Sequence, residues 1–362
     1  MKLVLAGGGT YGHVGPLLAL ANELRRRQAE VELRAVGTAE GIEASLVPAA
    51  GLELVTIPKV PLPRRPGAYA LRFPGLWFRA VRSLGEFLTD FAPDAVVGFG
   101  GYVATPVYRV AAARGLPIIV HEANARPGLA NRWGSKRAAA VGVAFAGTPL
   151  PGARLVGMPL RPAVATLDRA SARAGARELL GLEPDRSTLL VSGGSLGAVN
   201  LNSAVVGVAD RLLASGAQVL HLTGRGKAGA VSAAVSGLAG SERYHVLEYL
   251  ERMELALAAA DLAVQRAGAA TVCELACCGL PSVLVPLAIG NGEQRLNAAG
   301  LVQAGGAEIV ADADFADWAR VHLADLLVDD KRLAAMSEAA ASVAIRDGAA
   351  RLAALVETVV AS

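Results

Sequence analysis

Short, almost wholly apolar segments alternate with longer amphipathic ones along most of the chain. In the first half, the apolar segments that predict strands are Lys2–Ala6, Val31–Val36, Leu54–Ile57, Asp94–Val97, Ile118–His121 and Ala139–Val143. In the second half, they are Thr188–Val191, Val219–Leu222, Tyr244–Leu247, Leu262–Gln265, Ser282–Val285 and Ala307–Val310. Strands that are apolar throughout are typical of parallel sheets covered by helices on both faces. The alternation therefore predicts an α/β protein with two doubly wound parallel sheets.

The segments between the predicted strands have the apolar spacing of amphipathic helices. Val14–Arg27 is one of them, and it ends in three arginines, which suit the negative end of a helix dipole. From Asp312 onward the pattern is almost wholly helical. One Gly and two Pro interrupt the alternation at Leu155–Pro162, after which the strand–helix cycle restarts. We therefore place a boundary between two domains in this segment, as the length of 362 residues also suggests.

The composition and the cysteine positions restrict the class and compartment of the protein. The chain is 53% hydrophobic with a mean hydropathy of +0.42, yet no run reaches the roughly 18 apolar residues of a membrane-spanning helix. The first strand runs directly into a glycine turn, without the apolar core of a signal peptide. Cys273, Cys277 and Cys278 lie in a helical pattern with no His or further Cys at metal-binding spacing. We expect these thiols to pack in a reducing compartment, and the protein to be cytoplasmic.

Charge is unevenly distributed along the chain. The net charge is +3, but residues 1–157 hold 18 Lys and Arg against 10 Asp and Glu, a net charge of +8. Residues 158–362 hold 17 against 22, a net charge of −5, so an anionic partner is expected to meet the first half.

Apolar, aromatic and basic side chains interleave within Val60–Arg82, among them Trp77, Phe78 and Arg79. This mixture suits contact with an anionic membrane surface; a solvated loop over an ordinary core helix is the alternative.

Three glycine-rich turns follow predicted strands, at Gly7–His13, Gly98–Tyr102 and Gly193–Gly197. A turn of this kind before a helix makes an anion site, because free amide N–H groups and the positive end of the helix dipole converge. Ligands of doubly wound sheets bind at the carboxyl ends of the strands, so we expect a cleft between the two domains. The first turn lacks the dinucleotide fingerprint and the third lacks the Lys of a P-loop, which argues against nicotinamide enzymes and Walker-type ATPases.

Polar side chains gather at the same predicted edge of the first sheet. His13 falls where the first turn becomes a helix, and the helix dipole there favours the neutral imidazole that a general base needs. Whether His13 is a base or only closes the turn by hydrogen bonds stays open. His121, Glu122 and Asn124 lie at the end of the fifth predicted strand, and we expect their side chains to point toward the same cleft. Asn124 also suits simple capping of the strand end.

The richest group of polar and small residues in the second half is Gln265–Glu274. A strand ends at Gln265, Gly268 opens a turn, and a helix beginning near Ala269 supplies another anion-binding N-terminus. Glu274 lies within the first two turns of that helix, where its carboxylate can accept hydrogen bonds from a ribose. A charge that only favours the helix start is the alternative, and it contributes about 0.3–1 kcal/mol.

These motifs together resemble the MurG family of bacterial peptidoglycan glycosyltransferases, which add N-acetylglucosamine (GlcNAc) to the lipid-linked MurNAc-pentapeptide called lipid I. The matching segments, in family order, are Gly8–Val14, Gly100–Tyr102, His121–Asn124, Gly157–Arg161, Gly193–Gly197 and Arg266–Glu274 with Gln294 and Asn297. The resemblance implies a GT-B fold of two Rossmann-like domains with a cleft between them. Residues 1–157 would bind lipid I and the membrane, residues 158–342 would bind UDP-GlcNAc, and the closing helix at residues 343–362 would return to the first domain.

The resemblance also assigns site residues by position. Contacts to UDP-GlcNAc fall on Thr10, Tyr11, Gly12, Asn124, Arg161, Ser195, Leu250, Ala269, Ala270, Thr271, Val272, Cys273, Glu274 and Gln294. In this assignment Glu274 holds the ribose, Gln294 the sugar and the backbone of Leu250 the uracil. The acceptor and membrane side falls on Gly100, Gly101, Tyr102, Trp77, Phe78 and Arg79. The chain departs from the family at Tyr11, where Gly is usual, at Met158, where Asn is usual, and at Glu293, where Gln or His is common.

The implied reaction is an inverting transfer of GlcNAc from UDP-GlcNAc to the 4-hydroxyl of MurNAc. We expect His13 to be the base, with Glu122 as the runner-up, and Arg161 and amides near Ser195 to stabilise the leaving diphosphate. We expect no metal and no cofactor. The expected partners are UDP-GlcNAc, lipid I and an anionic membrane surface on the cytoplasmic face, but no nucleic acid. Alternatives are a sugar-nucleotide 2-epimerase of the same architecture and a non-catalytic nucleotide-binding protein of wall synthesis.

Overall fold

The computed structural model describes residues 1–63, 65–194, 198–287 and 292–362. The chain divides into two compact units, which are treated separately below. Unit 1 contains Met1–Arg161 together with Asp347–Ser362, and unit 2 contains Pro162–Arg346. Each boundary lies four residues beyond the position expected from the sequence.

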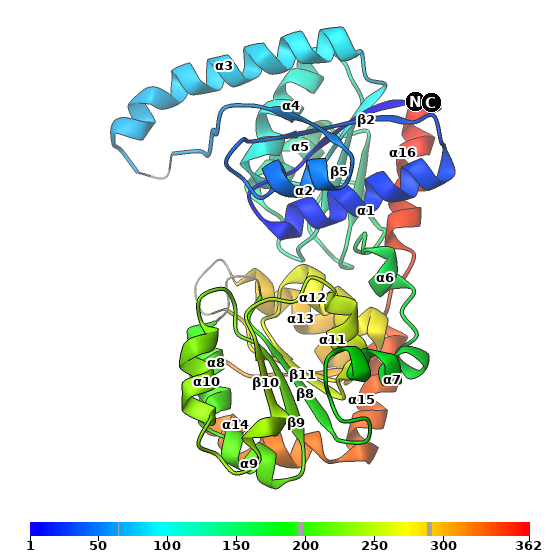
Figure 1. Ribbon diagram of the computed structural model, residues 1–362. Coiled ribbons are helices and arrows are strands. Elements are labelled where there is room, and N and C mark those ends of the chain that lie inside the picture. Colours follow the sequence, from blue (N-terminus) through cyan, green and yellow to red (C-terminus); the bar gives the residue numbers. More distant parts are fainter. Residues whose placement is uncertain (64, 195–197, 288–291) are drawn as a thin grey trace. The chain divides into compact units, whose positions relative to one another are not determined.

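Unit 1 is built on a seven-stranded, fully parallel sheet with the order β3-β2-β1-β4-β5-β6-β7 (Figure 1). Its strands are β1 Lys2–Ala6, β2 Glu32–Gly37, β3 Glu53–Thr56, β4 Ala95–Gly98, β5 Ile118–Glu122, β6 Ala140–Val143 and β7 Ala153–Leu155. Its helices are α1 Tyr11–Arg27, α2 Glu43–Ala49, α3 Ala68–Phe91, α4 Gly101–Ala113, α5 Leu129–Gly134 and α16 Gly348–Val360, and a 3₁₀ turn spans Ser135–Arg137.

Unit 2 repeats the plan with a six-stranded parallel sheet of order β10-β9-β8-β11-β12-β13. Its strands are β8 Thr188–Ser192, β9 Gln218–Leu222, β10 Tyr244–Leu247, β11 Leu262–Gln265, β12 Ser282–Leu284 and β13 Ala307–Ile309. Its helices are α6 Pro162–Ala165, α7 Arg169–Leu179, α8 Val199–Val206, α9 Ala209–Ala214, α10 Ala228–Val235, α11 Met253–Ala259, α12 Ala269–Cys278, α13 Glu293–Ala304, α14 Phe315–Leu327 and α15 Asp330–Ser342, with a 3₁₀ turn at Ser241–Arg243.

The predicted α/β class with two parallel sheets is confirmed, and all twelve predicted strands are present within one or two residues of their expected bounds. The thirteenth strand, β7, lies at the edge of the first sheet and was not predicted. Its three residues are all exposed, so it carries no apolar signal. In both sheets the strand order reverses beside the first strand of the unit, between β1 and β4 and between β8 and β11. Ligands of doubly wound sheets bind at such reversal points.

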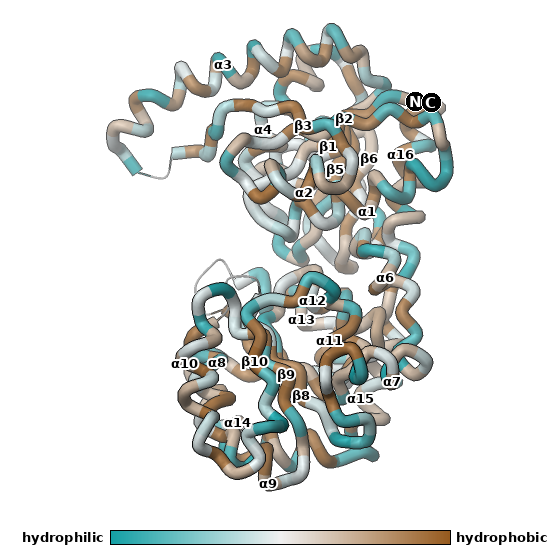
Figure 2. The backbone as a smooth tube through the Cα atoms, viewed as in Figure 1, coloured by the Kyte–Doolittle hydropathy of each residue, from teal (hydrophilic) through white to brown (hydrophobic). Residues whose placement is uncertain are grey.

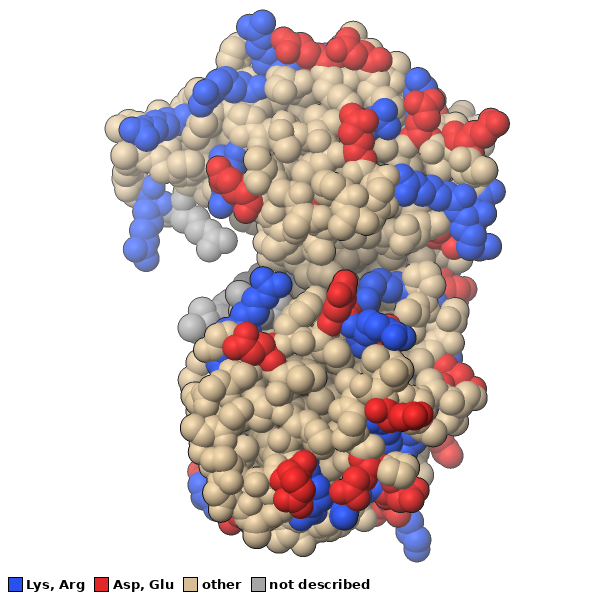
Figure 3. Space-filling model, viewed as in Figure 1, with Lys and Arg blue, Asp and Glu red and all other residues tan. Residues whose placement is uncertain are grey.

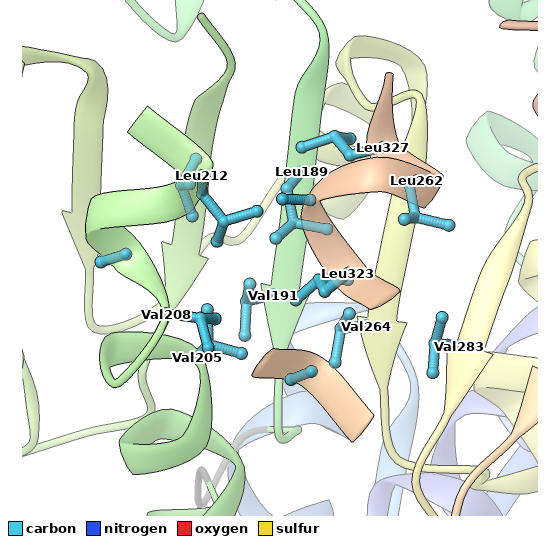
Figure 4. Close-up of a cluster of buried hydrophobic side chains, with 14 of the residues drawn as sticks. Leu189, Val191, Val205, Val208, Leu212, Leu262, Val264, Val283, Leu323 and Leu327 are labelled. Carbon is cyan, nitrogen blue, oxygen red and sulfur yellow. The ribbon is translucent and has the colours of Figure 1, made fainter. Parts of the chain in front are cut away.

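The inner strands, such as β1, β4, β8 and β11, are almost wholly apolar because each unit buries both faces of its sheet there. In β1, Leu3 and Leu5 belong to one buried cluster, whereas Val4 and Ala6 belong to another on the opposite face. The tube in Figure 2 accordingly shows the sheets as hydrophobic stretches. Helix α16 packs Leu352 into the cluster that also contains α1, which places this last helix in unit 1. In unit 2, β8, β11 and β12 pack against α8 and α14 (Figure 4).

Candidate functional site

The reversal point of unit 1 is built from two glycine turns, one after β1 and one after β4. Gly9, Gly100 and Gly101 have φ angles of 85°, 93° and 75°, a left-handed region that favours glycine. The turns also lie close together: a Cβ on Gly101 would approach the carbonyl oxygen of Gly8 to 2.7 Å. Two independent requirements, conformation and space, therefore select glycine at position 101.

His13 lies between these two turns. Its Nδ1 is 3.1 Å from the carbonyl oxygen of Gly8 and 3.1 Å from Oγ1 of Thr10. A carbonyl oxygen only accepts hydrogen bonds, so Nδ1 carries the proton and Nε2 of the neutral ring has a lone pair. A Cβ on Gly100 would lie 3.3 Å from Nε2, so glycine keeps this atom uncovered on that side. Burial lowers the pKa of His13, against a smaller raising effect of the Gly8 hydrogen bond and of two carboxylates.

Glu122 is buried at the end of β5, where its carboxylate accepts hydrogen bonds from the loop that follows. Oε1 accepts from the backbone N–H of Asn124 at 2.9 Å, and Oε2 accepts from the N–H of Gly128 at 3.0 Å and from Nδ2 of Asn131 at 3.0 Å. Asn131 in turn accepts a hydrogen bond at 2.8 Å from the fully buried Tyr108 hydroxyl. The carboxylate thus fixes the loop that carries Asn124.

The remaining predicted residues of unit 1 differ in accessibility. Thr10 and Tyr11 are exposed at the start of α1. The ring of Tyr11 packs against Gly15, one turn further along its own helix, rather than over the glycine turn. The ring of Tyr102 lies over Gly9, 3.1 Å from the position of a Cβ there. Gly12 is half-buried in the first turn of α1.

Sequence reasoning missed one charged residue of this region, Glu43. It is fully buried, and its carboxylate accepts hydrogen bonds from the N–H of Gly9 at 2.9 Å and from the N–H and hydroxyl of Thr38 at 3.0 and 2.8 Å. The available signal was a glutamate among apolar residues that directly follows glycine-containing turns at Gly37 and Gly41.

The reversal point of unit 2 lies at the ends of β8 and β11. Gly194 follows β8 with a φ of 85°, and its N–H lies 3.3 Å from Oγ of Ser192. Ser195, which was expected to contact the donor, lies outside the described residues. Arg266, the residue after β11, donates through Nη1 to Asp312 at 2.5 Å. Asp312 also accepts a hydrogen bond from the side-chain amide of Asn200 in α8 at 3.0 Å. The guanidinium of Arg266 is therefore engaged with the protein itself.

Helix α12 begins at Ala269 as predicted, after Gly268 in an extended conformation at its N-cap. Ala269 and Val272 are buried, whereas Ala270, Thr271, Cys273 and Glu274 are half-buried. Cys277 and Cys278 are buried at the end of the helix, and burial raises the pKa of Cys278 to about 12. The Cys278 thiol therefore stays protonated, and both thiols are buried in packing positions, as expected.

Of three further predicted donor contacts, Leu250 and Arg161 lie on loops and Gln294 lies in a helix. Gln294 in the first turn of α13 accepts a hydrogen bond from the N–H of Leu287 at 2.9 Å. This bond links Leu287, which follows β12, to the start of α13. Leu250 is half-buried after β10, and Arg161 is half-buried as the last residue of the first segment of unit 1. Met158 is buried, with its backbone close to Gly348 at the start of α16. Across the described ranges, no group of three or more His, Cys, Asp or Glu side chains is arranged to hold a metal ion.

Most of the basic and aromatic segment Val60–Arg82 lies in the first half of α3, which begins at Ala68 and projects from the rest of unit 1 (Figure 1). None of its residues before Ala80 is buried, and Leu71 and Phe78 are 85% and 65% exposed. Trp77 is half-buried and packs on Phe73, with ring centroids 5.9 Å apart. Figure 3 shows Lys and Arg side chains along this helix, and Arg65, Arg72, Arg79 and Arg82 are exposed. Within the described residues, no helix is both long and apolar enough to cross a bilayer.

Comparison with known proteins identifies the family. Residues 3–143 match the glycosyltransferase family 28 N-terminal domain, and residues 188–352 match the glycosyltransferase family 28 C-terminal domain. The chain is 55% identical over 361 residues to the UDP-N-acetylglucosamine--N-acetylmuramyl-(pentapeptide) pyrophosphoryl-undecaprenol N-acetylglucosamine transferase of Clavibacter michiganensis, covering 99% of this chain and 96% of the relative. The transferase of the same name from Nocardioides sp. is 50% identical, covering 98% and 97%.

Solved structures give the same result at the level of the fold. Acinetobacter baumannii MurG is similar with a TM-score of 0.79 and 28% identity, covering 99% of both chains. A UDP-GlcNAc 2-epimerase from Neisseria meningitidis also matches, with a TM-score of 0.71 but only 14% identity, so it shows the shared fold alone. The predicted GT-B fold is thereby confirmed. The chain belongs to glycosyltransferase family 28 and, within it, to the MurG family of hexosyltransferases.

Proposed function

We propose that this protein transfers GlcNAc from UDP-GlcNAc to the 4-hydroxyl of MurNAc in lipid I, which gives lipid II for peptidoglycan synthesis. The observation that carries the proposal is the 55% identity over nearly the whole chain to a relative named for this transfer. The epimerase alternative has only a shared fold in its favour, at 14% identity. A non-catalytic nucleotide-binding role was suggested by Tyr11, but its ring packs against Gly15 of its own helix, α1.

The chemistry we propose is an inverting displacement at the anomeric carbon. The MurNAc hydroxyl attacks from the face opposite to UDP, and negative charge grows on the β-phosphate oxygen as the glycosidic bond breaks. In unit 2, α8 and α12 begin after β8 and β11, the two strands at the reversal point of the sheet, and the first turn of a helix presents backbone N–H groups to an anion. Such preorganised amides stabilise the charge that develops in the transition state more than the substrate. Arg161 and Ser195 are the further donors that we assign to the diphosphate.

We assign the general base to His13. Its Nδ1 proton is held by the Gly8 carbonyl oxygen, so Nε2 of the neutral ring is the basic atom, and its lowered pKa keeps it neutral. Glu122 is the weaker candidate, because both oxygens of its carboxylate already accept hydrogen bonds from the following loop. A base contributes about 10²–10⁴-fold to the rate. Glu122 instead holds Asn124, which we place at the donor.

The first half of α3 is our proposed contact with the membrane. Its exposed apolar side chains can enter the interface, and each exposed arginine near an anionic leaflet contributes about 1 kcal/mol. We expect the wild-type protein to float with vesicles that contain anionic lipid, and the double variant Trp77→Ala, Arg79→Ala to bind them less. The matched control is Trp318→Ala, Arg320→Ala on α14, which removes one half-buried indole and one exposed cation from unit 2. Equal binding of both variants would refute the assignment of α3.

The proposed reaction is tested by incubating the purified protein with labelled UDP-GlcNAc and a water-soluble lipid I analogue. We expect label in a GlcNAc-MurNAc disaccharide, in equal amount to released UDP and only when the analogue is present. Label in an epimerised sugar nucleotide would support the epimerase, and binding of UDP-GlcNAc without any product would support the non-catalytic alternative. Either result would overturn the proposal.

A further inference from the structure

The buried carboxylate of Glu43 connects α2 to the glycine turn that holds His13. One oxygen accepts the Gly9 N–H at 2.9 Å, and the other accepts both donors of Thr38, the N–H at 3.0 Å and the hydroxyl at 2.8 Å. The Thr38 hydroxyl also lies 3.3 Å from the Tyr102 hydroxyl of α4. Glu43 therefore joins the ends of β1 and β2, and through Thr38 it reaches α4.

The backbone around this side chain leaves room for it only where glycine stands. A Cβ on Gly8 would lie 2.6 Å from Oε1 of Glu43, and a Cβ on Gly37 would lie 2.5 Å from its Cγ. A Cβ on Gly41 would overlap the carboxylate oxygens themselves. Three glycines, one after β1, one at the end of β2 and one before α2, thus pack against the Glu43 side chain, so its position is determined by both segments.

Glu43 is a charge buried among uncharged donors, since the hydrogen-bond partners of its carboxylate within the described residues are the amides and hydroxyl named above. Burial opposes ionisation of this carboxyl, but the hydrogen bonds from Gly9 and Thr38 outweigh burial and lower its pKa. A helix N-terminus is equivalent to about half a positive charge, which is less than the full negative charge behind this turn. The carboxylate of Glu43 therefore offsets the positive end of α1 at this turn.

We propose that Glu43 is a positioning residue, which fixes Gly8 and Gly9 so that the Gly8 carbonyl oxygen orients the imidazole of His13. Its negative charge additionally favours the imidazolium that forms when His13 takes a proton. The catalytic consequence rests on the proposed function of His13, whereas the orientation itself does not. Glu122 at the end of β5 is the other carboxylate that acts on His13, Tyr102 of α4 lies over Gly9, and α5 presents the uncharged Asn131.

The test is an NMR titration of the His13 ring, together with the amide resonance of Gly9, in the ligand-free full-length protein. Glu43→Gln removes the charge and keeps the shape, and Glu43→Asp keeps the charge but shortens its reach. Glu40→Gln is the matched control, because it makes the same charge change at an exposed position of the same loop. We expect Glu43→Gln to lower the His13 titration midpoint, and both Glu43 variants to shift the Gly9 amide and speed its hydrogen exchange. The control should do neither.

The result that overturns the proposal is a His13 titration and a Gly9 amide that are unchanged in Glu43→Gln, or changed equally in Glu40→Gln. Steady-state turnover with a lipid I analogue then tests separately whether Glu43 positions His13 and whether His13 is the base. If the NMR changes are present and kcat falls about tenfold or more, positioning of the base is supported. If the NMR changes are present and kcat is unaltered, Glu43 still positions His13, but the assignment of His13 as the base is wrong. The circular dichroism spectrum of Glu43→Asp checks that a loss of activity is not a loss of fold.

Discussion

Substitution of Gly101 by alanine tests the geometry of the two glycine turns most sharply. Gly101 has a φ of 75°, and an added Cβ would lie 2.7 Å from the carbonyl oxygen of Gly8 and 3.2 Å from Nδ1 of His13. The left-handed conformation costs a non-glycine residue about 1–2 kcal/mol. Relief of the overlap by a shift of the Gly8 backbone costs about 1–3 kcal/mol more. We therefore expect a loss of about 2–5 kcal/mol in the free energy of unfolding.

The matched control is Gly115→Ala, just beyond the other end of α4. Gly115 has a φ of 68°, but an added Cβ would meet no atom within 4 Å, so it carries only the conformational cost of about 1–2 kcal/mol. The assay is urea unfolding followed by circular dichroism, combined with steady-state turnover. Because Gly8 holds the ring of His13, Gly101→Ala should also lower kcat, whereas Gly115→Ala should not. Equal losses of stability in the two variants, with kcat unchanged in both, would refute the reasoning.

Three further predictions concern other contacts. Asn131→Ala should cost about 1–3 kcal/mol for each buried group it leaves unpaired, the Tyr108 hydroxyl among them, and an unchanged urea midpoint would contradict this. Asp312→Ala should leave the Arg266 guanidinium without its carboxylate and lower the free energy of unfolding by about 3 kcal/mol. It should also weaken UDP binding measured by calorimetry, and wild-type affinity would argue against a link between this ion pair and the donor site. Glu23 has its pKa lowered to about 2 by a hydrogen bond from an arginine, so it stabilises the fold above about pH 4.5 and loses this effect toward pH 2. Glu23→Gln should therefore lower Tm at neutral pH but not near pH 2, and a pH-independent difference would count against the ion pair.

The sequence predicts the fold well because strand and helix signals are local. β1, β10 and β11 have the bounds expected from their apolar runs; β11 is buried throughout, β1 is buried after Lys2, and β10 is buried at Tyr244. α1 begins at Tyr11, three residues before its apolar pattern, because the N–H groups of His13 and Val14 bond to the Thr10 carbonyl. Such caps depend on backbone geometry, which hydrophobic periodicity does not report.

The site is predicted less completely, because its contacts join distant segments. Glycine turns, His13 and the start of α12 are recognisable from local composition. Glu43 is not, since its partner Gly9 is 34 residues away in the chain. Glu122 is found from the sequence, but only the structure shows that the Gly128 and Asn131 donors occupy its carboxylate. Residue identity thus predicts where polar groups gather, whereas the direction of each hydrogen bond needs the fold.

The central claim is that His13 in the first glycine turn is the base for sugar transfer. The most direct measurement is kcat of His13→Ala and Glu122→Gln at saturating UDP-GlcNAc and lipid I analogue, with UDP affinity measured alongside. The account predicts a loss of about 10²–10⁴-fold for His13→Ala with UDP affinity retained, and a smaller loss for Glu122→Gln. Near wild-type turnover of His13→Ala, together with inactivity of Glu122→Gln, would contradict it and transfer the role to Glu122.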